Sequence, residues 1–170
     1  MDSEKTARMD WTGTQLLAAR EALRNRAESL LGRFLFEFAN LETGLDLCLV
    51  WVDQGRQLEE RTRKLEDDSN FHRKLVMLDT DLRNAPSEKG KKAYQAWLLR
   101  AHDIRLLRNV LVHGRLGLDV RDGSLTIVTS RATSDITRSR TLSLSEVEEH
   151  IAEIKRLVHD LNALRSAYPL

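Results

Sequence analysis

Residues 27–52 read AESLLGRFLFEFANLETGLDLCLVWV and carry the strongest helical signal in the chain. Apolar side chains recur there at steps of three and four residues, which is the spacing of one face of an α-helix. The members of this apolar stripe are Leu31, Phe34, Leu35, Phe38, Leu41, Leu45, Cys48, Leu49 and Val52. A stripe this wide is typical of a helix with neighbours on several sides, so we expect this helix at the centre of the fold.

Helical spacing of apolar residues also predicts helices over 70–82, 88–112 and 144–166, and over 14–25, either as a short helix or as the first turns of a longer one. The charged segment 53–69 fits an exposed helical connection or a loop. Between the last two helices the period changes to two, and Asp122-Gly123 separates the alternating runs, which indicates a hairpin. Residues 130–142 fit a third, weaker strand. We therefore expect an all-α bundle of four to five helices with a β-hairpin insertion at 115–142.

Composition adds limits to this picture. A chain of 170 residues fits a single domain over 1–170, with residues 1–12 as a loose N-terminal arm. No apolar run approaches the roughly 20 residues of a membrane span, and no signal-peptide pattern is present, so we expect a cytoplasmic protein without a membrane partner. Cys48 is the single cysteine, which excludes an internal disulfide and predicts a buried, inert thiol. Trp51 and Trp97 stand at helical spacing and are predicted in the core.

Residues 105–115 read RLLRNVLVHGR, with Arg108 and Asn109 separated from His113 by three apolar residues. On a helical wheel His102, Arg105, Asn109 and His113 fall within about 80°, because each residue turns the helix by about 100°. Such a polar stripe fits a site, and it also fits simple exposure to solvent. Arg108 lies on the flank beside the apolar face, where a guanidinium needs an anionic or carbonyl partner.

Glu42 presents the same problem in the 27–52 helix, because it falls within the apolar stripe. An unpaired carboxylate among apolar side chains is costly. We therefore hypothesise that Glu42 pairs with Arg108 or accepts a hydrogen bond from Asn109. The alternative is a carboxylate at the edge of the stripe that reaches water.

The Arg108-Asn109-x-x-x-His113 pattern, at the end of a long helix and before Gly114, resembles the motif of HEPN domains. The earlier apolar helix with Glu42 inside it is also similar to that family. The resemblance covers about residues 25–165. It implies a metal-independent endoribonuclease without a cofactor, acting as a homodimer whose two protomers line one cleft with their arginines and histidines. Such proteins commonly act as toxins or in phage defence, which would add an antitoxin or regulatory protein as a partner.

The chemistry of RNA cleavage by its own 2′-hydroxyl fits these residue types. His113 can transfer protons near neutral pH, and Arg108 can hold the scissile phosphate and stabilise its growing charge. Asn109 can orient His113 or bind the phosphate. A single imidazole cannot be acid and base at once, which gives a physical reason for a dimer with two copies of His113. Further phosphate or substrate contacts are predicted at His102, Arg105 and Arg115.

Two other interpretations stay open. The chain can be a non-catalytic HEPN-like module that dimerises and binds RNA, a nucleotide or a protein partner, or a structural adaptor with a coincidental motif. The remaining histidines, His72, His150 and His159, are scattered without metal-ligand spacing, and we predict no metal site. The formal net charge of +1 excludes broad electrostatic coating of RNA. It conceals a basic window at 100–115, where Asp103 is the single acid.

Overall fold

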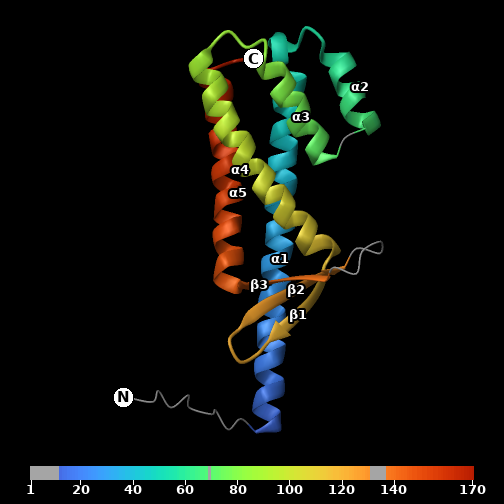
Figure 1. Ribbon diagram of the computed structural model, residues 1–170, viewed down its shortest axis with the longest axis vertical. Coiled ribbons are helices and arrows are strands. Elements are labelled where there is room, and N and C mark those ends of the chain that lie inside the picture. Colours follow the sequence, from blue (N-terminus) through green and yellow to red (C-terminus); the bar gives the residue numbers. More distant parts are fainter. Residues whose placement is uncertain (1–11, 69, 131–136) are drawn as a thin grey trace.

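The computed structural model describes residues 12–68, 70–130 and 137–170 (Figure 1). The elements in chain order are α1 (Gly13–Val50), a 3-10 turn η1 (Val52–Gly55), α2 (Leu58–Asp68), α3 (Phe71–Leu82), α4 (Glu88–His113), β1 (Arg115–Asp119), β2 (Ser124–Ser130), β3 (Thr137–Ser143) and α5 (Leu144–Ala167). The mostly helical architecture and the single small sheet agree with the prediction. The predicted N-terminal arm lies outside the described residues, except for Thr12.

Helix α1 is one continuous helix of 38 residues, so the segment predicted at 14–25 forms its first turns. Thr12 caps it: the Thr12 hydroxyl accepts from the Gln15 amide, and the Gln15 side chain accepts from the Thr12 amide. The N-terminal turns of α1 extend beyond the rest of the bundle (Figure 1). None of the helices in the described ranges, α1 included, combines the length and the apolar character needed to cross a membrane.

The charged segment after α1 forms both of its predicted alternatives, a turn followed by helix α2. Asp53, Gln54 and Gly55 take left-handed backbone conformations in succession, with φ of 56°, 58° and 76°, and so reverse the chain. The Trp51 side chain lies over Gly55, whose missing Cβ leaves room for the ring. Trp51 is 52% exposed, and its predicted place in the core is therefore wrong.

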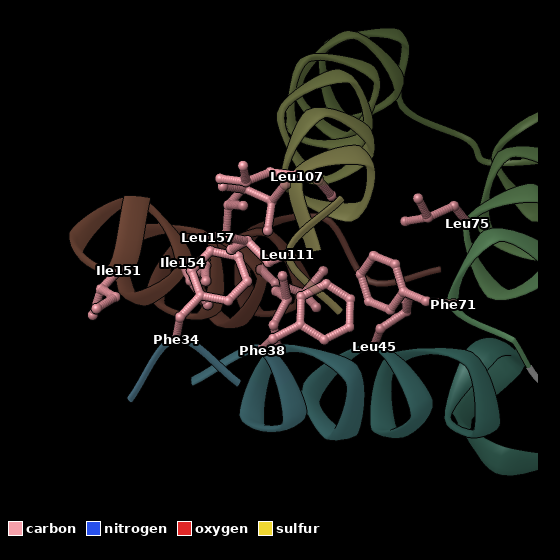
Figure 2. Packing of buried hydrophobic residues seen from close by; sticks show 14 of the residues in the cluster. Phe34, Phe38, Leu45, Phe71, Leu75, Leu107, Leu111, Ile151, Ile154 and Leu157 are labelled. Carbon is pink, nitrogen blue, oxygen red and sulfur yellow. The ribbon is translucent and has the colours of Figure 1, made fainter. Parts of the chain in front are cut away.

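The core lies where the buried face of α1 meets α3, α4 and α5. Phe34, Phe38 and Leu45 of α1 point toward side chains of the other three helices (Figure 2). The predicted stripe is confirmed at Phe34, Phe38, Leu41, Leu45, Cys48, Leu49 and Val52, and Trp97 is buried as predicted. Leu35 is an exception at 43% exposed, and Leu31 is half-buried, because Ala27 and Leu30 occupy the core face on that part of the helix.

Burial also explains the state of the single cysteine. The Cys48 thiol is enclosed in the core, and burial raises its pKa to about 11. A thiol that stays protonated at neutral pH is a poor nucleophile, which agrees with the predicted inert role.

The insertion before α5 is a three-stranded antiparallel sheet in the order β1-β2-β3, in which β3 is the third strand that the sequence indicated at 130–142. Asp119 pairs with Ser124 across the first turn, where Gly123 has a φ of 67°. Leu125, Ile127 and Leu142 are buried and attach the sheet to the bundle. Because β1 starts directly after α4, the sheet lies next to the end of the helix that carries the predicted site (Figure 1).

Candidate functional site

Helix α4 positions the motif residues. Its N-terminus is capped by Ser87, whose hydroxyl accepts from the Gly90 amide at 3.1 Å. Its last residue is His113, and Gly114 follows as the C-cap with its amide donating to the Val110 carbonyl at 2.9 Å. Gly114 is extended (φ −82°, ψ 155°), so the helix ends by running straight into β1 without a left-handed turn. His113 is therefore exposed at the junction of bundle and sheet.

A cavity of about 490 Å³ opens between α1, α4 and the start of α3. It is lined by Phe38, Glu42, Asn70, Phe71, His72, Arg105, Arg108, Asn109 and His113. The structure thus brings together five of the seven predicted site residues. His102 borders the cavity through its contact with Arg105, whereas Arg115 is exposed on β1 and does not line it.

Arg108 is half-buried at the wall of this cavity. The carbon at the centre of its guanidinium lies 5.7 Å from the centroid of the Phe38 ring, within the range of a cation–π contact. Its Nη1 donates to the Asn109 side-chain oxygen at 3.4 Å, and its Nε is buried without a partner. In the described ranges no carboxylate forms an ion pair with Arg108. Asn109 thus contacts the guanidinium of Arg108, and most donors of that group are unused.

The predicted pairing of Glu42 with Arg108 or Asn109 is wrong. Glu42 accepts from the Nζ of Lys74 on α3 at 2.9 Å, and Asp46 accepts from the same Nζ at 2.8 Å. The Lys74 side chain is only 6% exposed, so its ammonium depends on these two carboxylates more than the half-buried guanidinium of Arg108 depends on one. An ammonium is also a compact charge that two carboxylates one helical turn apart can share.

This buried cluster has a consequence for the cavity. Burial of Lys74 opposes its charge, but hydrogen bonds to Asp46 and Glu42 outweigh that effect and raise its pKa above 10.5. Lys74 is therefore charged at neutral pH and offsets the Glu42 carboxylate. The sequence contains a signal for this residue, because Lys74 stands three residues after Phe71 and four before Leu78 in the apolar stripe of α3.

A second guanidinium and two further imidazoles lie around the same cavity. Nη2 of Arg105 is 3.4 and 3.5 Å from the two ring nitrogens of His102, and Nε of Arg105 is buried without a partner. The His102 ring in turn lies edge-on to His72, with 6.2 Å between centroids. The sequence pattern indicated no role for His72, which was one of the scattered histidines. The signal that places it here is Asn70, which caps α3 and so fixes Phe71 and His72 in its first turn.

The side chains around the cavity can do two things chemically. Two guanidiniums with unpaired donors can bind an anion, and the bidentate geometry of guanidinium suits a phosphate. Imidazoles can accept and donate protons near neutral pH. Over the residues that the structure describes, no group of three or more His, Cys, Asp and Glu side chains is arranged to hold a metal ion.

Comparisons with protein-family models, with curated proteins and with solved structures found no match to this chain. The resemblance to HEPN domains accordingly stays a prediction, carried by the motif and the helix order.

Proposed function

We propose that this protein is a metal-independent endoribonuclease of the HEPN type, which cleaves RNA by attack of the RNA's own 2′-hydroxyl. The observation that carries the proposal is the state of Arg108. It faces a cavity beside His113, its Nε is buried without a partner, and the neighbouring carboxylate Glu42 is held by Lys74. A guanidinium kept free of carboxylates in this way is suited to an incoming phosphate.

The size and lining of the cavity fit this substrate class. A volume of about 490 Å³ lies within the range of about 300–1,000 Å³ that is usual for small-molecule sites, and it can take a nucleotide unit with its phosphate. Arg108 and Arg105 would hold the non-bridging phosphate oxygens, and His113 would transfer a proton. Asn109 has a positioning part, because its side-chain oxygen accepts from the Arg108 guanidinium.

A homodimer is part of the proposal, and the solvent face of α4 supports it. Leu99 is 72% and Leu106 47% exposed. Residues on the same face follow one another at alternating steps of three and four, which is the spacing of the contact face between two paired helices; they are Leu99, His102, Leu106, Asn109 and His113. A second copy seated on this face would border the rim of the cavity.

The biological setting that we propose comes from the family resemblance. The protein would act in the cytoplasm as a growth-arresting toxin or in phage defence, under the control of an antitoxin or another regulatory protein. Expressing a tagged form of this chain together with the untagged products of adjacent genes, and checking which of them co-purify, would test for such a partner.

The test of the activity uses the purified full chain, total RNA and EDTA. We expect cleavage by the wild type and its loss in Arg108→Ala and His113→Ala. His159→Ala is the matched control, because His159 is an exposed histidine on α5 outside the cavity. Cleavage that needs a divalent metal, or that survives both substitutions, would contradict the mechanism. Binding without cleavage would instead favour the non-catalytic module.

A further inference from the structure

Two imidazoles of one protomer line the cavity. His113 comes from the end of α4 and His72 from the first turn of α3, and both side chains are exposed to solvent. Arg105 and Arg108 line the same cavity. The two helices are fixed relative to each other and to α1 by the buried core and by the Lys74 cluster, so the pair does not depend on a mobile loop.

We propose that His72 is a catalytic residue of the site and forms, with His113 of the same protomer, the complete acid–base pair. This inference rests on the proposed ribonuclease function and adds to it a residue that the Arg-Asn-x-x-x-His motif does not contain. It also changes the chemical reason for a dimer, because a second copy of His113 is no longer needed to supply the missing acid or base.

The two histidines reach the cavity from opposite ends of their helices. His72 is the second residue of α3, and His113 is the last residue of α4. We assign the base to His72 and the acid to His113, and the pH profiles of the two variants test this order.

The carboxylates described around His72 are not paired with it. The charged and titratable groups that share hollows or ring contacts with it, from α1, α2, α4 and its own helix α3, are Glu42, Arg61, Lys64, Arg73, Asp79, Asp81, His102, Arg105, Arg108 and His113. Glu42 is engaged by Lys74, and Asp81 by Arg61 at 2.9 Å. No carboxylate in the described ranges forms an ion pair with His72.

The resulting step balances without any further reactant. His72 takes the proton of the 2′-hydroxyl, and the 2′-oxygen forms a bond to phosphorus. The bond between phosphorus and the 5′-oxygen breaks, and His113 gives its proton to that leaving oxygen. The products are a 2′,3′-cyclic phosphate and a 5′-hydroxyl end, and the two imidazoles return to their starting states by exchanging protons with water. Arg105 and Arg108 stabilise the negative charge on the non-bridging oxygens.

The test is the pH profile of kcat for His72→Asn on a short RNA oligonucleotide in EDTA. We expect kcat to fall about 10²–10⁴-fold with a much smaller change in KM. The residual activity should lose its rise with pH on the acidic side, while His113→Asn should lose its fall on the basic side. His159→Asn is the matched control and should retain the wild-type kcat, because His159 is exposed on α5 and does not line the cavity. Circular dichroism of each variant checks that it is folded.

A mixing experiment decides whether the pair belongs to one protomer. His72→Asn and His113→Asn are combined under conditions that allow subunit exchange, and we expect no recovery of activity. Recovery toward about a quarter of the wild-type rate would assign the two histidines to different subunits and overturn the proposal. Wild-type kcat in His72→Asn would also overturn it. A wild type that cleaves no RNA would instead overturn the ribonuclease function from which the inference starts.

Discussion

Arg100 and Arg108 lie two turns apart on α4. Arg100 has carboxylate partners, whereas Arg108 has none among the described residues. Arg100 donates from Nε to Glu153 at 2.7 Å and from Nη1 to Asp160 at 2.8 Å, both on α5. These two hydrogen bonds raise the pKa of Arg100 above its usual value. Arg108 has the Phe38 ring and the Asn109 amide as its contacts, and its Nε is buried without a partner.

The difference separates a structural arginine from one that is available to a ligand. Arg100 joins α4 to α5 through two hydrogen bonds to carboxylates. Arg108 faces a cavity that Glu42 also lines, but the Glu42 carboxylate is engaged by Lys74. A half-buried guanidinium with unused donors costs folding free energy, and uncompensated polar groups of this kind are typical of functional sites.

Of the changes that test this comparison, removal of Arg108 has the largest expected effect. Arg108→Ala should lower the single-turnover rate of RNA cleavage by about 10²–10³-fold, because the charge that stabilises the transition state is lost. Its free energy of unfolding should change by no more than about 1 kcal/mol, since no ion pair is broken. Arg108→Lys keeps the charge and loses the bidentate geometry, so its cleavage rate should lie between those of the wild type and Arg108→Ala. An unchanged rate in Arg108→Ala would abolish the distinction between the two arginines.

The next effect concerns Lys74, the residue that engages the Glu42 carboxylate. Lys74→Met leaves two neighbouring, partly exposed carboxylates without their shared cation, and should lower the free energy of unfolding by about 2–3 kcal/mol. Glu42→Gln should cost about 1 kcal/mol and keep the cleavage rate within about threefold. Urea unfolding and single-turnover assays measure both. A Glu42→Gln variant of normal stability that has lost cleavage would show that Glu42 acts on Arg108 after all.

The Lys74 cluster also predicts a dependence of stability on pH. The pKa of Lys74 is raised in the folded state. Its contribution to the free energy of unfolding is therefore fully present below the ordinary lysine pKa of 10.5, and is lost as the pH rises through the higher pKa of the folded state. The difference in unfolding free energy between wild type and Lys74→Met should therefore stay constant from pH 7 to 9 and shrink above about pH 10.5. Taking the difference cancels the titration of Cys48, which both proteins share. A difference in unfolding free energy that shrinks already below pH 9 would contradict the raised pKa of Lys74.

The smallest effect is expected at Arg100. Its ion pairs with Glu153 and Asp160 are partly exposed and screened by salt, so Arg100→Ala should cost about 1 kcal/mol or less. Its rate of RNA cleavage should equal that of the wild type. A loss of stability that disappears in high salt would identify the cost as electrostatic. A loss of cleavage at unchanged stability would extend the site along α4 and remove the contrast with Arg108.

Much of this architecture could be predicted from the sequence because periodicity reports which face of an element is buried. The spacing of apolar residues placed α3, α4 and α5 within about one residue of their observed ends. The change to a period of two located β1 and β2. Asn109 and His113 line one cavity, as their shared stripe on α4 indicated, and Arg108, which the wheel placed on the flank of that helix, lines it too.

The contacts between helices could not be predicted, because periodicity gives a face and not a neighbour. The sequence indicated that Glu42 needs a cationic partner, but it did not show whether that partner is Arg108 or Lys74, because both lie on helices that pack near α1. The packing of α3 on α1 decides the partner, because it places Nζ of Lys74 2.9 Å from a carboxylate oxygen of Glu42. His72 was missed for the same reason, since its role depends on where the first turn of α3 meets α4.

The central claim is that Arg108, left without a carboxylate, binds the scissile phosphate of RNA. The most direct test measures single-turnover cleavage of one RNA oligonucleotide in EDTA by wild type, Arg108→Ala and Arg100→Ala, with an all-deoxy oligonucleotide as the substrate control. We predict equal rates for wild type and Arg100→Ala, a rate about 10²–10³-fold lower for Arg108→Ala, and no cleavage of the deoxy strand. Equal rates for all three proteins, or cleavage of the deoxy strand, would contradict the claim.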